Sequence, residues 1–122
     1  MKKYDITGAE AWKMNNQFYP IRKIKNKSDS YSYVGCGGMM VKGDLFEELG
    51  KFDERFFKYF EDPDICFLAD REGHKIGWNC EPVIVHNHIG PLLNNTTKKY
   101  FIDSLNKFRQ KWKDYTAPVL GK

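Results

Sequence analysis

The chain has 122 residues and a mass of 14.4 kDa, the size of one domain or of part of one, which excludes a large multidomain enzyme. Hydrophobic residues make up 41% and aromatic residues 16%, enough to bury a core, which excludes a disordered chain. No run approaches the ~20 apolar residues of a bilayer span, and the polar start is unlike a signal peptide, so we expect a soluble, cytoplasmic protein.

The net charge of +4 is unevenly distributed along the chain. Residues 1–30 hold seven Lys/Arg and three Asp/Glu, residues 42–75 hold six and ten, and residues 76–122 hold seven and three. An acidic centre between basic flanks argues against a nucleic-acid-binding face and suits a carboxylate-lined pocket for a cation. The cysteines Cys36, Cys66 and Cys80 follow no disulfide or metal spacing, and we expect reduced thiols that pack in the interior.

The first thirty residues are polar and form a variable segment in our interpretation. Thr7 followed by Glu10 has the form of a capping box and predicts a short helix through Met14. Pro20 and the polar stretch 23–30 predict a loop.

A charge-free stretch, 31–41, predicts a buried strand interrupted by Gly35, Gly37 and Gly38, where another backbone or a ligand can approach closely. Asp44 and Glu47 form a second capping box, which predicts a short helix over 45–49.

Asp62 and Pro63 are a typical N-cap and first helical residue, and Gly73 a typical terminator, so a helix is predicted over 63–72. Strands are predicted over 75–79 and 83–86. An amphipathic C-terminal helix is predicted by the spacing of its apolar residues, Phe101, Leu105, Phe108 and Trp112. Alternating strands and helices place the chain in the α/β class.

Three carboxylates, Glu61, Asp62 and Asp64, lie within four residues at the start of the predicted helix. Like charges raise one another's pKa while a helix N-terminus lowers it, a balance that suits a general base. The alternative is that Asp62 caps the helix and its neighbours are solvated. The spacing leaves both interpretations open.

The central segment contains several motifs in a fixed order: Gly37-Gly38, Leu49-Gly50-Lys51-Phe52-Asp53-Glu54, Tyr59-Phe60-Glu61-Asp62-Pro63-Asp64, Gly73 and His86. In their order and spacing they resemble the C-terminal half of family 2 glycosyltransferases, which have a GT-A fold. The resemblance covers about residues 34–90 and is weaker over 106–112.

The resemblance implies a partial GT-A-like fold, with a short mixed sheet packed by helices. Residues 31–95 would form the glycosyltransferase core and residues 96–122 the C-terminal amphipathic helix and tail. The implied function is that of a bacterial-type, inverting, metal-dependent enzyme that moves a sugar from a nucleotide-diphosphate donor to a glycan or lipid-linked acceptor. The alternative is a non-catalytic carbohydrate- or protein-interaction module derived from that fold.

By the same resemblance, Asp62 is the catalytic base, because a sugar hydroxyl is too weak an acid to ionise at neutral pH. The substrate-binding residues would be Gly37, Gly38, Tyr59, Glu61 and Asp64. His86 would join a divalent cation, Mn²⁺ or Mg²⁺, that neutralises the diphosphate, and His88 shares its face if the strand continues.

The sequence departs from the family in three places. No Asp-x-Asp motif precedes the strand at Tyr33, so we expect the donor-nucleotide half to be absent and exposed apolar surface to favour homo-oligomers. Leu68 stands where the family commonly has Arg. The Gln-x-x-Arg-Trp motif of processive synthases is not reproduced at Arg109–Trp112, which favours a single-addition enzyme.

Two further groups of side chains have alternative interpretations. Several aromatic side chains could stack on a sugar ring, although most of them are expected in the core. They are Tyr31, Tyr33, Phe57, Tyr59, Trp78 and Trp112. The cations of the C-terminal helix form a solvated surface, or else they attract the inner face of an anionic membrane, where a lipid-linked acceptor would lie. These cations are Lys98, Lys99, Lys107, Arg109, Lys111 and Lys113.

Overall fold

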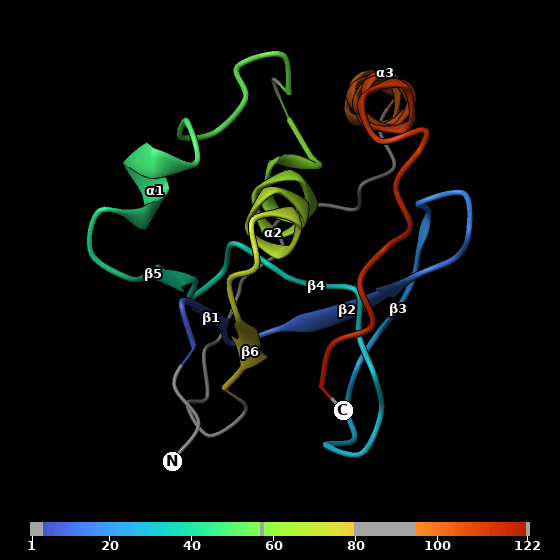
Figure 1. Ribbon diagram of the computed structural model, residues 1–122. Helices are drawn as coiled ribbons and strands as arrows, with labels where there is room; N and C mark the ends of the chain where they lie inside the picture. Colours follow the sequence, from blue (N-terminus) through green and yellow to red (C-terminus); the bar gives the residue numbers. More distant parts are fainter. Residues whose placement is uncertain (1–3, 57, 80–94, 122) are drawn as a thin grey trace.

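The computed structural model describes residues 4–56, 58–79 and 95–121 (Figure 1). Strand β1 (Ile6–Gly8) is the centre of one sheet, antiparallel to β5 (Met40–Val41) and parallel to β6 (Ile76–Trp78). In a second sheet, β2 (Ala11–Met14) lies between β3 (Pro20–Lys23) and β4 (Tyr33–Val34), antiparallel to both. The described residues therefore form two small three-stranded sheets.

The two sheets meet where β1 ends. A Cβ atom on Gly8 would lie 2.6 Å from Cβ of Val34, so only glycine lets β1 approach β4 this closely. The loop from Gly8 to Ala11 then leads directly into β2. This junction brings residues early in the chain next to the end of β4.

The described part of the chain contains helices α1 (Leu45–Glu48), α2 (Glu61–Arg71) and α3 (Asn95–Lys111). Helix α2 packs on β4 and β6 (Figure 1). Its apolar face is fully buried at Ile65, Cys66 and Phe67, and the Cys66 thiol donates to the Val34 carbonyl at 3.7 Å. Hydrophobic burial thus fixes which face of α2 points to the sheets.

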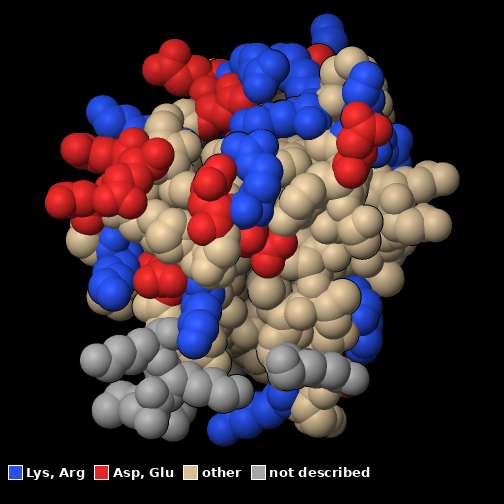
Figure 2. Space-filling model, viewed as in Figure 1, with Lys and Arg blue, Asp and Glu red and all other residues tan. Residues whose placement is uncertain are grey.

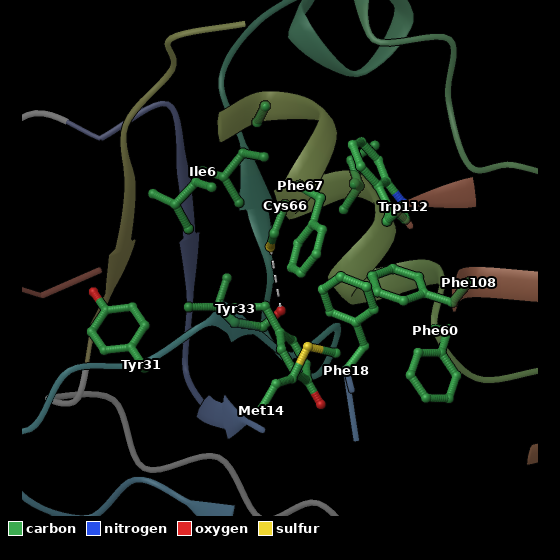
Figure 3. Packing of buried hydrophobic residues seen from close by; sticks show 14 of the residues in the cluster. Ile6, Met14, Phe18, Tyr31, Tyr33, Phe60, Cys66, Phe67, Phe108 and Trp112 are labelled. Atoms are coloured by element: carbon green, nitrogen blue, oxygen red, sulfur yellow. Dashed lines mark hydrogen bonds between the residues drawn. The ribbon is translucent and has the colours of Figure 1, made fainter. Parts of the chain in front are cut away.

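An aromatic cluster joins α2 to α3 and to the loop after β2 (Figure 3). Phe108 of α3 is completely buried, and its ring centroid lies 4.9 Å from that of Phe67 and 5.4 Å from that of Phe18. The chain after α3 returns to the second sheet, where Leu120 pairs with Tyr31. The core therefore includes residues from both ends of the described chain.

The predicted mixed α/β class is confirmed, as are the helices at 45–49 and 63–72, the strand at 75–79 and the C-terminal helix, each with shifted ends. The predicted stop at Gly50 is confirmed by its φ of 89° just after α1. Asp44, however, makes no side-chain capping bond. The strand predicted at 83–86 and the third cysteine, Cys80, lie outside the described residues.

Three predictions in the first half of the chain are wrong. The segment 7–14 forms strands β1 and β2 rather than a helix, because pairing with four other strands outweighs a local capping pattern. The predicted loop is wrong at Pro20, which begins the edge strand β3, where a residue without an N–H is tolerated, whereas residues 24–30 do form a loop. The strand expected over 31–41 is two strands in different sheets, separated by a turn in which Gly38 has a φ of 75°.

Candidate functional site

The chain enters helix α2 through two strained residues. Tyr59 and Phe60 have φ values of 68° and 69°, in the left-handed region that non-glycine residues avoid. The buried Phe60 ring packs 5.3 Å from the rings of both Phe101 and Phe108, which holds this turn in place. The aromatic cluster therefore sets the direction of the acidic first turn of α2.

Asp62 is inside helix α2 and is not its N-cap, which corrects the local interpretation of this residue. The N-cap position belongs to Phe60. Oδ2 of Asp62 instead accepts a hydrogen bond from the backbone amide of Cys36 at 3.3 Å. The carboxylate is thus directed toward the segment that follows β4.

The surroundings of Asp62 raise its pKa to about 7. Burial is the largest cause, the neighbouring charge of Glu61 adds to it, and the Cys36 amide opposes it by stabilising the anion. Glu10 contributes a further smaller increase. A carboxyl group with this pKa exchanges its proton near neutral pH, as a general base requires.

The segment after β4 makes a tight turn beside Asp62. The amide of Met39 donates to the carbonyl of Cys36 at 3.1 Å, which places Gly37 and Gly38 in the turn. These two predicted substrate-binding residues therefore directly follow the amide that contacts Asp62. Burial, followed by the charge of Asp62, raises the pKa of the Cys36 thiol to about 12, so this thiol stays protonated at neutral pH.

Two further residues join this site: Glu10, which the sequence placed only in a capping box, and Trp12, which belongs to no motif. A Cβ atom built on Gly35 would lie 3.7 Å from Oδ2 of Asp62, 3.7 Å from Oε2 of Glu10 and 3.6 Å from Nε1 of Trp12. The amide of Gly35 also donates to the Glu10 carbonyl at 2.9 Å. Because the pairing of β2 with β4 creates this proximity, no spacing along the chain could reveal it.

Glu61 contributes a second carboxylate beside Asp62. Its Oε2 atom is buried and, among the described residues, has no hydrogen-bond partner. A buried polar atom without a partner costs free energy, and a catalytic role or a bound water or ion is among the usual reasons for one.

Asp64 connects α2 to the end of α3. Its side chain is 1% exposed, and Oδ1 accepts from Nε1 of Trp112 at 2.8 Å. Nζ of Lys111 donates to Oδ2 of Asp64 at 3.0 Å and to Oδ2 of Asp53 at 3.0 Å. Burial raises the pKa of Asp64, and the hydrogen bond from Lys111 opposes this rise. All contacts that the structure gives Asp64 are structural, and its role toward substrate stays a prediction.

Of the other predicted site residues, one is described by the structure and two are not. Tyr59 is half-buried, with its ring against that of Phe101 at a centroid distance of 5.6 Å. His86 and His88 lie outside the described residues. Within the ranges that are described, no three His, Cys, Asp or Glu side chains are arranged to hold a metal ion.

Acidic side chains gather over α1 and basic ones toward α3 (Figure 2). Several of these cations are engaged in contacts: Lys111 with the two aspartates, Lys107 with the Arg55 carbonyl at 3.1 Å, and Arg109 with the Gln17 carbonyl at 2.8 Å.

No helix in the described part of the chain is both long and apolar enough to cross a bilayer.

A curated protein is similar to this chain in sequence. Over 91 residues the chain is 32% identical to the low-salt glycan biosynthesis hexosyltransferase Agl10 of Haloferax volcanii. The chain is similar to a glycosyltransferase. The match includes 73% of this chain and 29% of the relative, so the chain spans less than a third of that protein's length. No protein-family model matches, and no solved structure matches.

Proposed function

We propose that this chain is the acceptor-side portion of a nucleotide-sugar-dependent glycosyltransferase, with Asp62 as its general base. The observation that carries the proposal is the Asp62 carboxyl, which has a pKa of about 7 and is oriented by the Cys36 amide. The similarity to a hexosyltransferase supports the same class of reaction.

The proposed reaction is a single displacement. A hydroxyl of the acceptor gives its proton to Asp62 as its oxygen forms a bond to the anomeric carbon of the donor sugar. The bond from that carbon to the nucleoside diphosphate breaks, and the diphosphate leaves with the electron pair. Attack opposite the leaving group inverts the configuration, which we propose for this protein.

The neighbours of Asp62 have defined tasks in this proposal. The Cys36 amide aims one carboxylate oxygen, and burial, together with the charge of Glu61, keeps the carboxylate basic enough to take a proton. We retain Gly37, Gly38 and Tyr59 as substrate-contacting residues. A glycan or lipid-linked acceptor, a peripheral position at the inner face of a membrane and the GT-A fold of family 2 belong to the same proposal.

A divalent cation, Mn²⁺ or Mg²⁺, would offset the charge that develops on the leaving diphosphate. The described residues do not make a complete site for it, although Glu61 offers a buried oxygen without a partner. His86 and His88, which the family resemblance assigns to the metal, lie outside the described residues. We therefore assign no step of the reaction to the cation.

The decisive experiment compares Asp62→Asn with Asp44→Asn. The protein is combined with a separately supplied donor-nucleotide half and incubated with nucleoside-diphosphate hexoses, a glycan acceptor and Mn²⁺, and transfer is followed by mass spectrometry of the acceptor. We expect Asp62→Asn to lower the rate at least about 100-fold, the usual contribution of a general base. Asp44→Asn changes an exposed carboxylate without a capping bond and should leave the rate unchanged.

Two outcomes would contradict the proposal. Transfer by Asp62→Asn at the wild-type rate would remove Asp62 from the reaction. Glycan binding without transfer from any donor would favour the alternative, a non-catalytic carbohydrate-interaction module.

A further inference from the structure

A small space beside Gly35 is surrounded by polar atoms from β2, from α2 and from the loop that precedes β2. We name it the Gly35 notch and define it by Glu10, Trp12, Gly35 and Asp62. The three polar atoms lie 3.6 to 3.7 Å from the point where a Cβ atom of residue 35 would stand. The space therefore accommodates a group about as large as a methyl, and the absence of a side chain at Gly35 keeps it open.

The polar atoms of the notch have unused hydrogen-bonding capacity. In the described ranges, Nε1 of Trp12 makes no hydrogen bond, and the Glu10 carboxylate is paired only through Oε1, with Lys23 at 3.2 Å. Both side chains are half-buried rather than enclosed, and that of Glu10 is 14% exposed. A ligand can therefore reach both residues.

Tyr33 adds a second donor to the same region. It is directly opposite Trp12 in the pairing of β2 with β4, so both side chains are on one face of the sheet. Tyr33 is 94% buried, and its hydroxyl makes no hydrogen bond in the described structure. Burial is the main reason that its pKa is raised well above 10, and the charges of Asp62 and Glu10 add to this effect.

The combination of donors and acceptors selects a neutral ligand. A phosphate or carboxylate would be repelled by Glu10 and Asp62, and a metal ion would face the N–H of Trp12. A hydroxyl group suits all of them, because it accepts from the indole N–H and donates to a carboxylate. Several adjacent hydroxyls, as in a sugar, can use these groups together.

We infer that the Gly35 notch binds a hydroxyl of the acceptor sugar, with Glu10 and Trp12 as further acceptor-binding residues. The inference rests on the proposed function, because it places that hydroxyl beside Oδ2 of Asp62. The notch restricts the acceptor at this point to a hydroxyl whose neighbouring group fits beside the backbone of Gly35.

Gly35→Ala tests the notch directly. The added methyl fills the space and makes only ordinary contacts with the three polar atoms, and the backbone of Gly35 is not in the left-handed region, so the variant should fold. Binding of the methyl glycosides of glucose, galactose and mannose is measured by NMR. We expect the indole N–H signal of Trp12 to shift saturably, and Gly35→Ala to weaken binding about tenfold.

Glu10→Gln provides a second variant, with Glu47→Gln as its matched control on the exposed surface of α1. We expect a raised KM for the acceptor, an unchanged KM for the donor and no effect of Glu47→Gln. Wild-type glycoside affinity in Gly35→Ala and Glu10→Gln, or no shift at Trp12, would overturn the inference even if Asp62-dependent transfer persists. Glycoside binding that Gly35→Ala weakens, in a protein that transfers no sugar, would uphold the notch and refute the transferase proposal.

Discussion

The backbone amide of Cys36 donates a hydrogen bond to Oδ2 of Asp62, 26 residues further along the chain, at 3.3 Å. This bond connects the end of β4 to the first turn of α2. It orients a carboxyl whose pKa is about 7, so the fold places a group that titrates at neutral pH beside the Gly35 notch. Five predictions follow from this arrangement and from the core that supports it.

The transfer rate should depend on pH through Asp62. A general base acts when deprotonated, so kcat/KM should fall about tenfold per pH unit below a midpoint near pH 7 and level off above it. Glu61→Gln removes the charge that raises this pKa, so the midpoint should shift to lower pH. A pH–rate profile of both proteins measures this. A wild-type midpoint near pH 4 would contradict the environment described for Asp62.

Stability should depend on pH through the same residue. The folded-state pKa of Asp62 lies above its value of 3.8 in the unfolded chain, so its contribution is fully present below pH 3.8 and is lost as pH rises through 7. Asp62→Asn removes this loss and should stabilise the protein at pH 8 by about 2–3 kcal/mol relative to its effect at pH 5. Urea unfolding at the two pH values tests it, and equal effects at both would count against a raised pKa.

The buried Asp64 should matter for stability. Asp64→Ala leaves the Trp112 N–H and one side of Lys111 without a partner, which should cost about 3–5 kcal/mol in the free energy of unfolding. The control is Asp103→Ala, which removes an exposed pair with Lys107 and should cost less than about 1 kcal/mol. Similar midpoints in urea for both variants would show that the buried network does not hold α3.

Phe108 should be a main contributor to the aromatic core. It is completely buried between the rings of Phe18, Phe60 and Phe67, so Phe108→Ala leaves a cavity and should cost about 3–5 kcal/mol. Val119 is 73% exposed, and Val119→Ala should change stability by less than about 0.5 kcal/mol. Thermal unfolding compares the two, and a small effect at Phe108 would contradict the packing described.

Gly8 and Gly35 should differ in their tolerance of alanine. Gly8→Ala forces a Cβ to within 2.6 Å of Cβ of Val34 at the junction of the sheets, which should cost about 1–3 kcal/mol. Gly35→Ala meets only the ends of side chains at 3.6 Å or more and should leave the unfolding midpoint nearly unchanged. The reverse order of stabilities would mean that the sheets do not meet at Gly8.

Patterns within a few residues predicted the helices and part of the site. The repeat of Phe101, Leu105 and Phe108 predicted α3, and the order of motifs around Asp62 predicted both the acidic first turn of α2 and the kind of protein to which the chain is similar. The helix predicted from the capping pattern at Thr7 does not form, because this segment pairs with strands that are distant in the sequence. The same kind of pairing brought Glu10 and Trp12 to Gly35.

The sequence by itself determined the local elements and the chemical character of the acidic turn, because helix periodicity, glycine stops and clustered carboxylates act over one or two turns of chain. Only the tertiary structure decided which carboxylate serves which purpose. Asp62 and Asp64 are two residues apart, yet one faces the Cys36 amide and the other is buried against Lys111 and Trp112. The physical reason is that helical rotation and packing against β4 and α3 give the two side chains different surroundings, and those surroundings set their charge and their partners.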